Sequence, residues 1–235
     1  MKFEDTIKKL SAIAAGFFIF FLAAGAYLSY KGFAFNNGSI TLVKSANAAE
    51  TAAKSIPSNV VIPGGRSLGS AKAPVVVYEY SSLGCFHCAD FHLKTLPQLK
   101  KEYIDSGKVR VVFSNFPLDQ TSLKAAMLAS CMPNSKYHDF INVLFKKQRS
   151  WSMSFNPEKA LARLAAANGM SESEAYKCME DKERAQEIVG RRQEAMKTVD
   201  IKGTPTFVIA NRTSREVIFG ALSYDEIKKL IDKKL

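Results

Sequence analysis

The feature that most constrains the fold of this chain is a pair of cysteines, Cys85 and Cys88, which follows directly on the apolar run 75–80. Continuous β-branched and aromatic residues predict a buried strand over 74–80, and apolar residues recur at helical spacing after Cys85. This places Cys85 at a helix N-terminus, where unpaired N–H groups and the helix dipole stabilise a thiolate. Because the thiolate is the nucleophile of disulfide exchange, the spacing indicates redox chemistry.

Metal binding is the main competing interpretation of the two cysteines. A structural zinc site needs two more ligands, and the sequence has no second close cysteine pair. His92 offers a third ligand, but the fourth would have to come from far along the chain. A c-type haem site is excluded, because Ala89 stands where that motif requires histidine.

The length and the net charge of the chain limit its possible architecture and partners. The 235 residues are 47% hydrophobic and 23% charged, which predicts one domain preceded by a leader. The formal net charge is +11, but lysine and arginine are spread along helical faces without a dense basic run or a nucleic-acid motif. We therefore expect a solvated surface near an anionic membrane, and no nucleic acid as a partner.

The start of the chain reads as a targeting segment over residues 1–30. Lys8 and Lys9 precede an uncharged apolar stretch, 10–30, which is just long enough to cross a hydrocarbon core of ~30 Å. The positive residues predict a cytoplasmic N-terminus. Ala24-Gly25-Ala26 fits a signal-peptidase site, so the segment is either a cleaved signal peptide or a retained anchor. Both outcomes export the remainder to a compartment where disulfides persist.

Turn-forming residues and the scarcity of core anchors predict a flexible linker over residues 31–66. This linker has room for a short strand over 39–43. The folded part after the linker then alternates between strands and helices. A second strand over 108–113 completes a strand–helix–strand unit, which implies parallel pairing. Two further strands at 206–210 and 216–219 form a hairpin, and Ser223 with Glu226 opens the last helix.

A block of helices separates these two parts. Its apolar residues fall on single helical faces over roughly 123–131, 137–145 and 160–167. Ser171 and Glu174 form a capping box that opens a fourth helix, and a fifth runs from about Glu183 to Lys197.

The whole pattern resembles the DsbA-like thiol–disulfide oxidoreductases of bacterial envelopes, of the alphaproteobacterial type. The resemblance runs from Leu68 to the C-terminus, and it rests on Ala73-Pro74, Cys85-Phe-His-Cys88 and Gly203-Thr-Pro-Thr-Phe207. It implies an α/β class: a thioredoxin fold over 67–235, with a helical insertion at about 118–199.

The resemblance also implies roles for individual residues. Cys85 matches the exposed nucleophile and Cys88 the buried resolving thiol. Pro205 matches a cis-proline beside the sulfurs that leaves the Thr204 backbone free to pair with substrate; an ordinary trans proline on an edge strand is the alternative. Glu79 matches a buried acid that moves protons for the inner thiol. The alternative for Glu79 is a rim glutamate paired with a lysine.

The remaining chemistry-bearing residues are the histidines and two further cysteines. His87 can donate a hydrogen bond or positive charge toward Cys85, which favours an oxidant. Phe86 departs from the proline most familiar at its position, and this leaves the strength of the oxidant open. We expect His92 to be partly exposed and structural, and His138 to lie at the solvent edge of its helix.

Cys131 and Cys178 are the two cysteines left over. In an exported protein they most simply pair with each other, with two buried free thiols as the alternative.

These observations predict a periplasmic oxidase, anchored by residues 10–30 or soluble after cleavage, that introduces disulfides into unfolded exported proteins. A membrane partner must reoxidise it, and we expect no cofactor and no bound metal. The alternatives are an isomerase or reductase of the same fold and, from another class, a metal-binding chaperone that uses Cys85, Cys88 and His92.

Overall fold

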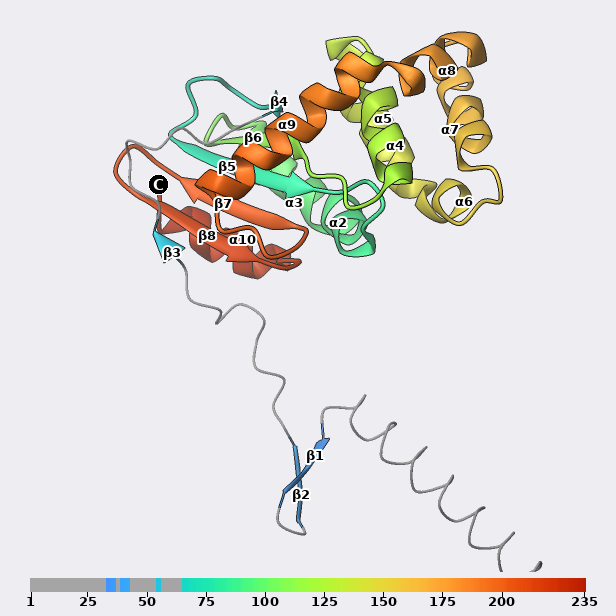
Figure 1. Cartoon of the computed structure of the whole chain (residues 1–235). Coiled ribbons are helices and arrows are strands. Elements are labelled where there is room, and N and C mark those ends of the chain that lie inside the picture. Colours follow the sequence, from blue (N-terminus) through green and yellow to red (C-terminus); the bar gives the residue numbers. More distant parts are fainter. Residues whose placement is uncertain (1–32, 37–38, 43–53, 56–64) are drawn as a thin grey trace, which may run out of the picture. The chain divides into compact units, whose positions relative to one another are not determined.

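The computed structural model describes residues 33–36, 39–42, 54–55 and 65–235 (Figure 1). It divides the chain into two units, 1–50 and 51–235. The first contains an antiparallel hairpin of β1 (Phe33–Asn36) and β2 (Ser39–Leu42), and β2 lies where the sequence allows a short strand. The expected signal peptide or anchor at 1–30 lies outside the described residues. Within the described part of the chain, no helix has both the length and the apolar character that a bilayer crossing requires.

A six-stranded sheet organises the second unit, with the strand order β3-β8-β7-β5-β6-β4. The central strands β5 and β6 are parallel, as the strand–helix–strand pattern predicts, and β7 and β8 form the predicted hairpin. Of the two edge strands, β3 lies within the expected linker 31–66 and β4 begins at its last residue. The strand bounds are β3 (Lys54–Ser55), β4 (Arg66–Leu68), β5 (Val75–Ser81), β6 (Val109–Asn115), β7 (Thr206–Ala210) and β8 (Arg215–Phe219).

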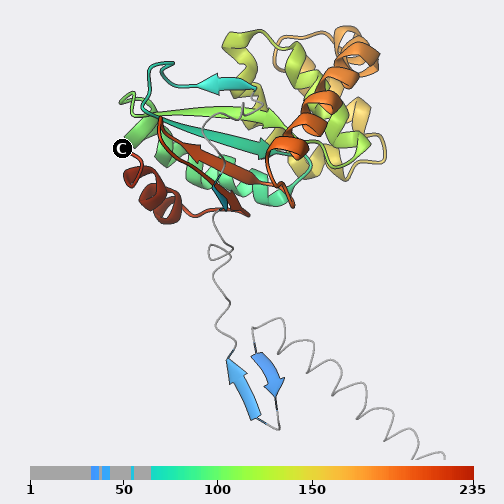
Figure 2. The same ribbon diagram turned by 60° about the vertical axis from the view of Figure 1, so that its left-hand side comes forward.

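Helices cover both faces of this sheet (Figure 2). Val75 and Val77 of β5 pack on the face that is covered by the helical segment 86–104 and by α10 (Tyr224–Asp232). Tyr80 points to the opposite face, where it packs with the C-terminal end of α9 (Lys182–Thr198). The alternation of side chains along a strand therefore places Glu79 on the same face as Val75 and Val77.

The segment 86–104 is one helical rod with alternating geometry. It consists of α2 (Phe86–Asp90), the π-helical turn η2 (Phe91–Thr95), α3 (Leu96–Leu99) and the π-helical turn η3 (Lys100–Ile104). Pro97 in α3 has no N–H to donate to the preceding turn, which explains a local departure from α-helical bonding just before it. The first π-helical turn contains His92.

The helical insertion runs from α4 to α9: α4 to α8 gather at one end of the sheet, and α9 runs from there back over one sheet face (Figure 1). Asp119 and Ser122 form a capping box on α4, and the predicted box of Ser171 and Glu174 opens α8. The short helix α6, which follows α5 after one residue, was not predicted. The remaining bounds are α4 (Gln120–Cys131), α5 (Asn134–Lys146), α6 (Gln148–Ser152), α7 (Pro157–Ala166) and α8 (Glu172–Glu180).

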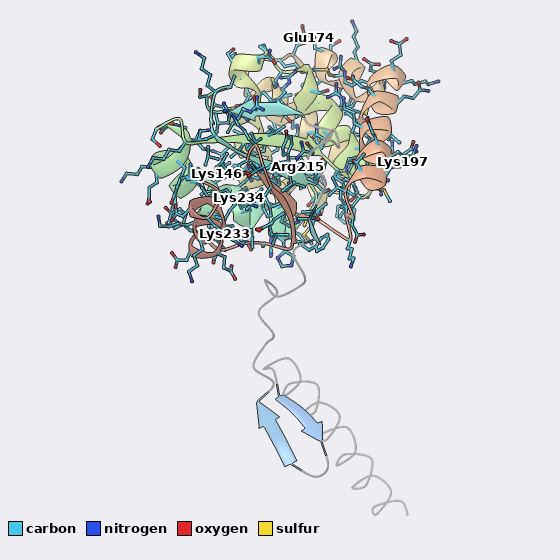
Figure 3. The ribbon with its side chains drawn as sticks, turned by 90° about the vertical axis from the view of Figure 1, so that its left-hand side faces the viewer. Lys146, Glu174, Lys197, Arg215, Lys233 and Lys234 are labelled. Atoms are coloured by element: carbon cyan, nitrogen blue, oxygen red, sulfur yellow. A yellow bond between two sulfur atoms is a disulfide. The ribbon has the colours of Figure 1, made fainter. Side chains whose placement is uncertain are left out.

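Basic side chains are carried by several separate elements, as the sequence predicts. The lysines labelled in Figure 3 belong to α5 (Lys146), α9 (Lys197) and the C-terminal end that follows α10 (Lys233, Lys234). Both C-terminal lysines lie 3.4 Å from the Glu216 carboxylate. Part of the positive charge is therefore locally compensated.

Candidate active site

The two cysteines occupy the predicted junction between strand and helix. Cys85 is the N-cap residue of α2, and its backbone N–H donates to the Ser82 carbonyl at 3.0 Å. Its side chain is partly exposed, whereas Cys88 is fully buried one turn further on. Both thiols are free in the structure.

The loop before β7 brings Thr204 and Pro205 against the first sulfur. The Thr204–Pro205 peptide bond is cis, the geometry that the resemblance implies. The Cys85 Sγ lies 3.3 Å from the Thr204 carbonyl oxygen, to which it donates when the thiol is protonated, although 119 residues separate them. The Pro205 carbonyl in turn accepts from the Gly220 N–H at 2.9 Å, which ties this loop to the end of β8.

The environment makes the two thiols chemically unequal. A hydrogen bond from the Cys88 thiol is the largest contribution that lowers the pKa of Cys85, which falls to about 5. Burial opposes this effect, while the Thr204 side chain and the backbone N–H groups of His87 and Cys88 add to it. Burial raises the pKa of Cys88 far above its usual range, and the negative charge of Glu79 adds to the rise. The site therefore holds a thiolate at Cys85 and a thiol at Cys88 near neutral pH.

Glu79 lies inside the core, close enough to Cys88 for its charge to act on that thiol. Its side chain is 0% exposed, and its Oε2 atom lies 3.0 Å from His92 Nε2. The partner of Glu79 is thus a buried histidine, and the alternative of a rim glutamate paired with a lysine is wrong. The expectation of a partly exposed His92 is also wrong, since this ring packs 4.3 Å from Phe145, between centroids.

Comparison with known proteins identifies the family. A family model described as thioredoxin matches residues 62–233. The chain belongs to the thioredoxin family and is DsbA-like. It is 31% identical over 179 residues to "Disulfide bond formation protein D" of Bacillus subtilis, covering 74% of this chain and 78% of that protein.

The solved structure of Wolbachia pipientis alpha-DsbA1 is similar to this DsbA-like chain. The TM-score is 0.67 at 31% identity, and the match covers 74% of this chain and 92% of that one. Together with the sheet order and the helices between β6 and β7, this confirms the predicted thioredoxin fold with a helical insertion.

A curated relative from Rickettsia prowazekii is longer than the region of similarity. It is named "Putative protein-disulfide oxidoreductase" and is 30% identical over 169 residues, which is 72% of this chain and 60% of that protein. The DsbA-like chain therefore matches less than two thirds of the length of this relative.

His87 acts differently from the sequence-based expectation. Its side chain is exposed, and its contribution to the lowered pKa of Cys85 comes from the backbone N–H. Phe86 is also exposed, and the Arg149 guanidinium lies 5.5 Å from the centre of its ring. The dipeptide between the cysteines thus presents an aromatic and a basic group outward.

Gln148 is a site residue that sequence reasoning missed. From the start of α6 its side-chain amide donates to the Leu83 carbonyl at 2.6 Å and to the Cys85 carbonyl at 3.0 Å. It is buried at 3% exposure. No motif marks this glutamine, and the two carbonyls that accept from it lie 65 and 63 residues away along the chain.

Cys131 and Cys178 form a disulfide in the structure, with their Cα atoms 6.5 Å apart. The bond joins the last residue of α4 to α8, inside the helical insertion. These are the two residues whose pairing the sequence favours.

The described residues do not bring together the ligands that a metal site needs. No group of three or more His, Cys, Asp or Glu side chains there could hold a metal ion. His92, the third ligand that a metal-binding chaperone requires, is bonded to Glu79 instead.

Proposed function

We propose that this chain is a protein-disulfide oxidoreductase that introduces disulfide bonds into other proteins through Cys85 and Cys88. The observation that carries the proposal is the difference between the two thiols: the pKa of Cys85 is lowered to about 5 and that of Cys88 is raised. Stabilising the Cys85 thiolate stabilises the reduced protein, and this makes its disulfide a stronger oxidant.

The reaction begins when a thiolate of the substrate attacks Cys85, the partly exposed sulfur. The Cys85–Cys88 bond breaks, and its electron pair leaves with the Cys88 sulfur. A second substrate thiolate then attacks the substrate sulfur of the mixed disulfide, and Cys85 leaves as a thiolate. The substrate loses two electrons and gains a disulfide, while the protein leaves as the dithiol.

The loop at Thr204 and Pro205 supports a role in holding the substrate. Pro205 is buried, and the Thr204 carbonyl lies beside the Cys85 sulfur. Extended substrate backbone paired with Thr204 would place a substrate sulfur next to Cys85. The exposed ring of Phe86 adds apolar surface at the same position.

We further propose that the substrates are unfolded exported proteins containing cysteine, and that a membrane partner reoxidises the dithiol. The apolar stretch 10–30 supports a periplasmic location, either anchored to the inner membrane or soluble after cleavage. The disulfide between Cys131 and Cys178 supports an oxidising compartment.

The redox state of Cys85 and Cys88 in cells tests the direction of the reaction. Acid quenching followed by thiol trapping of the full chain should find the pair predominantly as a disulfide. A predominantly dithiol pair would instead identify an isomerase or a reductase. In a purified assay, Cys85→Ser and Cys88→Ser should each abolish the oxidation of a reduced peptide, and full activity in either variant contradicts the proposal.

A further inference from the structure

A path of buried polar groups, formed by Glu79 and His92, starts near Cys88. Glu79 is the first group on this path, close enough for its charge to raise the pKa of Cys88. One carboxylate oxygen, Oε2, is bonded to His92. The other, Oε1, is buried and has no hydrogen-bond partner among the described residues. A buried carboxylate oxygen without a partner is costly, and such atoms are commonly retained for chemistry.

His92 is the second group, and it connects the core to a cavity. The Nε2···Oε2 contact of 3.0 Å with Glu79 holds one proton, whichever of the two groups carries it. His92 also lines a cavity of about 260 Å³ whose other walls include Leu68, Leu96, Phe113 and Ile141. The histidine thus lies between the Glu79 carboxylate and a space large enough to admit water.

The π-helical turn gives His92 this position. The ring lies 5.0 Å from Phe113 and 4.3 Å from Phe145, between centroids, so β6 and α5 hold it from two sides. Such turns within α-helices are frequent at functional sites. The rest of the rod supplies Cys88 one helical turn earlier.

We propose that His92, through Glu79, relays protons between Cys88 and water in this cavity. The proposal rests on the function proposed above and names a positioning residue for the step in which the Cys88 sulfur leaves. When a mixed disulfide forms at Cys85 during oxidation of a substrate, the departing Cys88 thiolate takes the proton held by Glu79 and His92. Water in the cavity then returns a proton to His92.

The same path works in reverse when the dithiol is reoxidised. A mixed disulfide at Cys85 is resolved when the Cys88 sulfur attacks the Cys85 sulfur and the outer thiolate leaves. Cys88 must first lose its proton, which passes to Glu79 and onward to His92. Because Cys88 is fully buried, this proton has no direct contact with solvent.

Other titratable groups face Glu79 and His92 from the elements packed around them. His138 of α5 lines the same cavity, but its Nε2 is bonded to the Ser67 carbonyl at 3.0 Å and it lies 4.9 Å from Phe113. It contacts no carboxylate through that nitrogen. The others are Tyr137 and Asp139 of α5, Lys100 of η3 and Arg66 of β4.

Capture of glutathione separates the two chemical steps. The reduced full-length chain is mixed with oxidised glutathione, quenched in acid at successive times and weighed by mass spectrometry. Cys85 first takes up one glutathione, and Cys88 then expels it. In His92→Gln the amide can still donate to Glu79 but cannot be protonated. We expect capture to be unchanged and expulsion to slow about tenfold or more, so that the glutathione adduct accumulates.

His138→Gln is the matched control, because it makes the same replacement in the same cavity. It should leave both steps unchanged. Glu79→Gln should slow expulsion as His92→Gln does, and the double variant should be no slower than the slower single variant. Unchanged expulsion in His92→Gln overturns the relay. Equal slowing of capture and expulsion also overturns it, because it shows a structural role.

A measurement on the unmodified chain tests the relay even if the variants fail to fold. In heavy water, expulsion of glutathione should slow more than capture, and an absence of this difference contradicts the relay. Failure of the proposed function is distinguishable, since the unmodified protein would then neither capture nor expel glutathione.

Discussion

The side-chain amide of Gln148 donates a hydrogen bond to the carbonyl oxygen of Cys85 at 3.0 Å. One residue of the helical insertion thus holds the backbone of the exposed cysteine, and a second bond from the same nitrogen holds Leu83. The insertion is therefore part of the redox site as well as a cover for it. Trp151, three residues further on, is fully buried and donates to the Leu144 carbonyl, which fixes α6 against α5.

Gln148→Ala should lower both stability and the rate of thiol exchange. The substitution removes the Gln148 donor from the carbonyls of Leu83 and Cys85, although the Cys85 carbonyl still accepts from the Ala89 N–H at 3.1 Å. Loss of a donor to a buried group costs about 1–3 kcal/mol. The substitution also frees the loop that positions Cys85. Denaturant unfolding and the rate of peptide oxidation measure the two effects. Gln98→Ala is the control, because Gln98 donates to the Lys94 carbonyl on the surface. Equal effects of the two substitutions would contradict a special role for Gln148.

The reactivity of Cys85 should titrate near pH 5. Its pKa is lowered to about 5, so the rate of alkylation by iodoacetamide should rise through that pH and level off by about pH 7. In Cys88→Ala the midpoint should move upward, because the hydrogen bond from Cys88 is the largest contribution that lowers the pKa. In His87→Ala it should move little, since His87 contributes through its backbone. A midpoint near 8.5 in the unmodified chain would refute this account.

Local sequence signals predict most of the fold because they are periodic. The parallel pair β5 and β6, the hairpin of β7 and β8 and the capping boxes at Ser171 and Ser223 lie where alternation, helical spacing and capping residues place them. Such signals act within a few residues of the chain. The strands β3 and β4 are too short to show alternation, and the α6 helix is only 5 residues long.

The site shows the limit of the same reasoning. Cys85 and Cys88 stand out through their spacing, and Pro205 through its resemblance to a family motif. The contact between Glu79 and His92 depends instead on how a strand and a π-helical turn pack. The spacing of these two residues in the sequence does not indicate it. The bond from Gln148 to Cys85 spans 63 residues and depends on the docking of a whole helix.

The stability of the reduced protein should rise with pH relative to the oxidised protein. Reduced Cys85 ionises at about pH 5 in the folded chain but only near pH 8.5 when unfolded, so between these values the unfolded state binds more protons. The stabilisation is present in full above the unfolded pKa and is lost as the pH falls through 5. The raised pKa of Cys88 acts oppositely above pH 8.5, where only the unfolded thiol ionises.

Unfolding by urea of the two redox forms at pH 4.5, 6 and 7.5 measures this difference. The gap in unfolding free energy between the reduced and oxidised forms should shift in favour of the reduced form at each step. A constant gap over this range would contradict a lowered pKa of Cys85. The Cys85→Ala variant, which cannot form the disulfide, is the control for the reduced form alone, and its unfolding free energy should lack the gain with pH that the Cys85 thiolate gives the reduced protein.

Removing the disulfide between Cys131 and Cys178 should destabilise the helical insertion without abolishing redox chemistry. The bond closes a loop with a sequence separation of 47, and the chain-entropy model assigns such a loop about 4 kcal/mol. The double variant Cys131→Ala/Cys178→Ala should therefore unfold at markedly lower denaturant concentration. Its Cys85 should still react with iodoacetamide with a midpoint near pH 5, because neither residue contributes to that pKa. Loss of Cys85 reactivity in a folded double variant would instead show that this disulfide acts on the site.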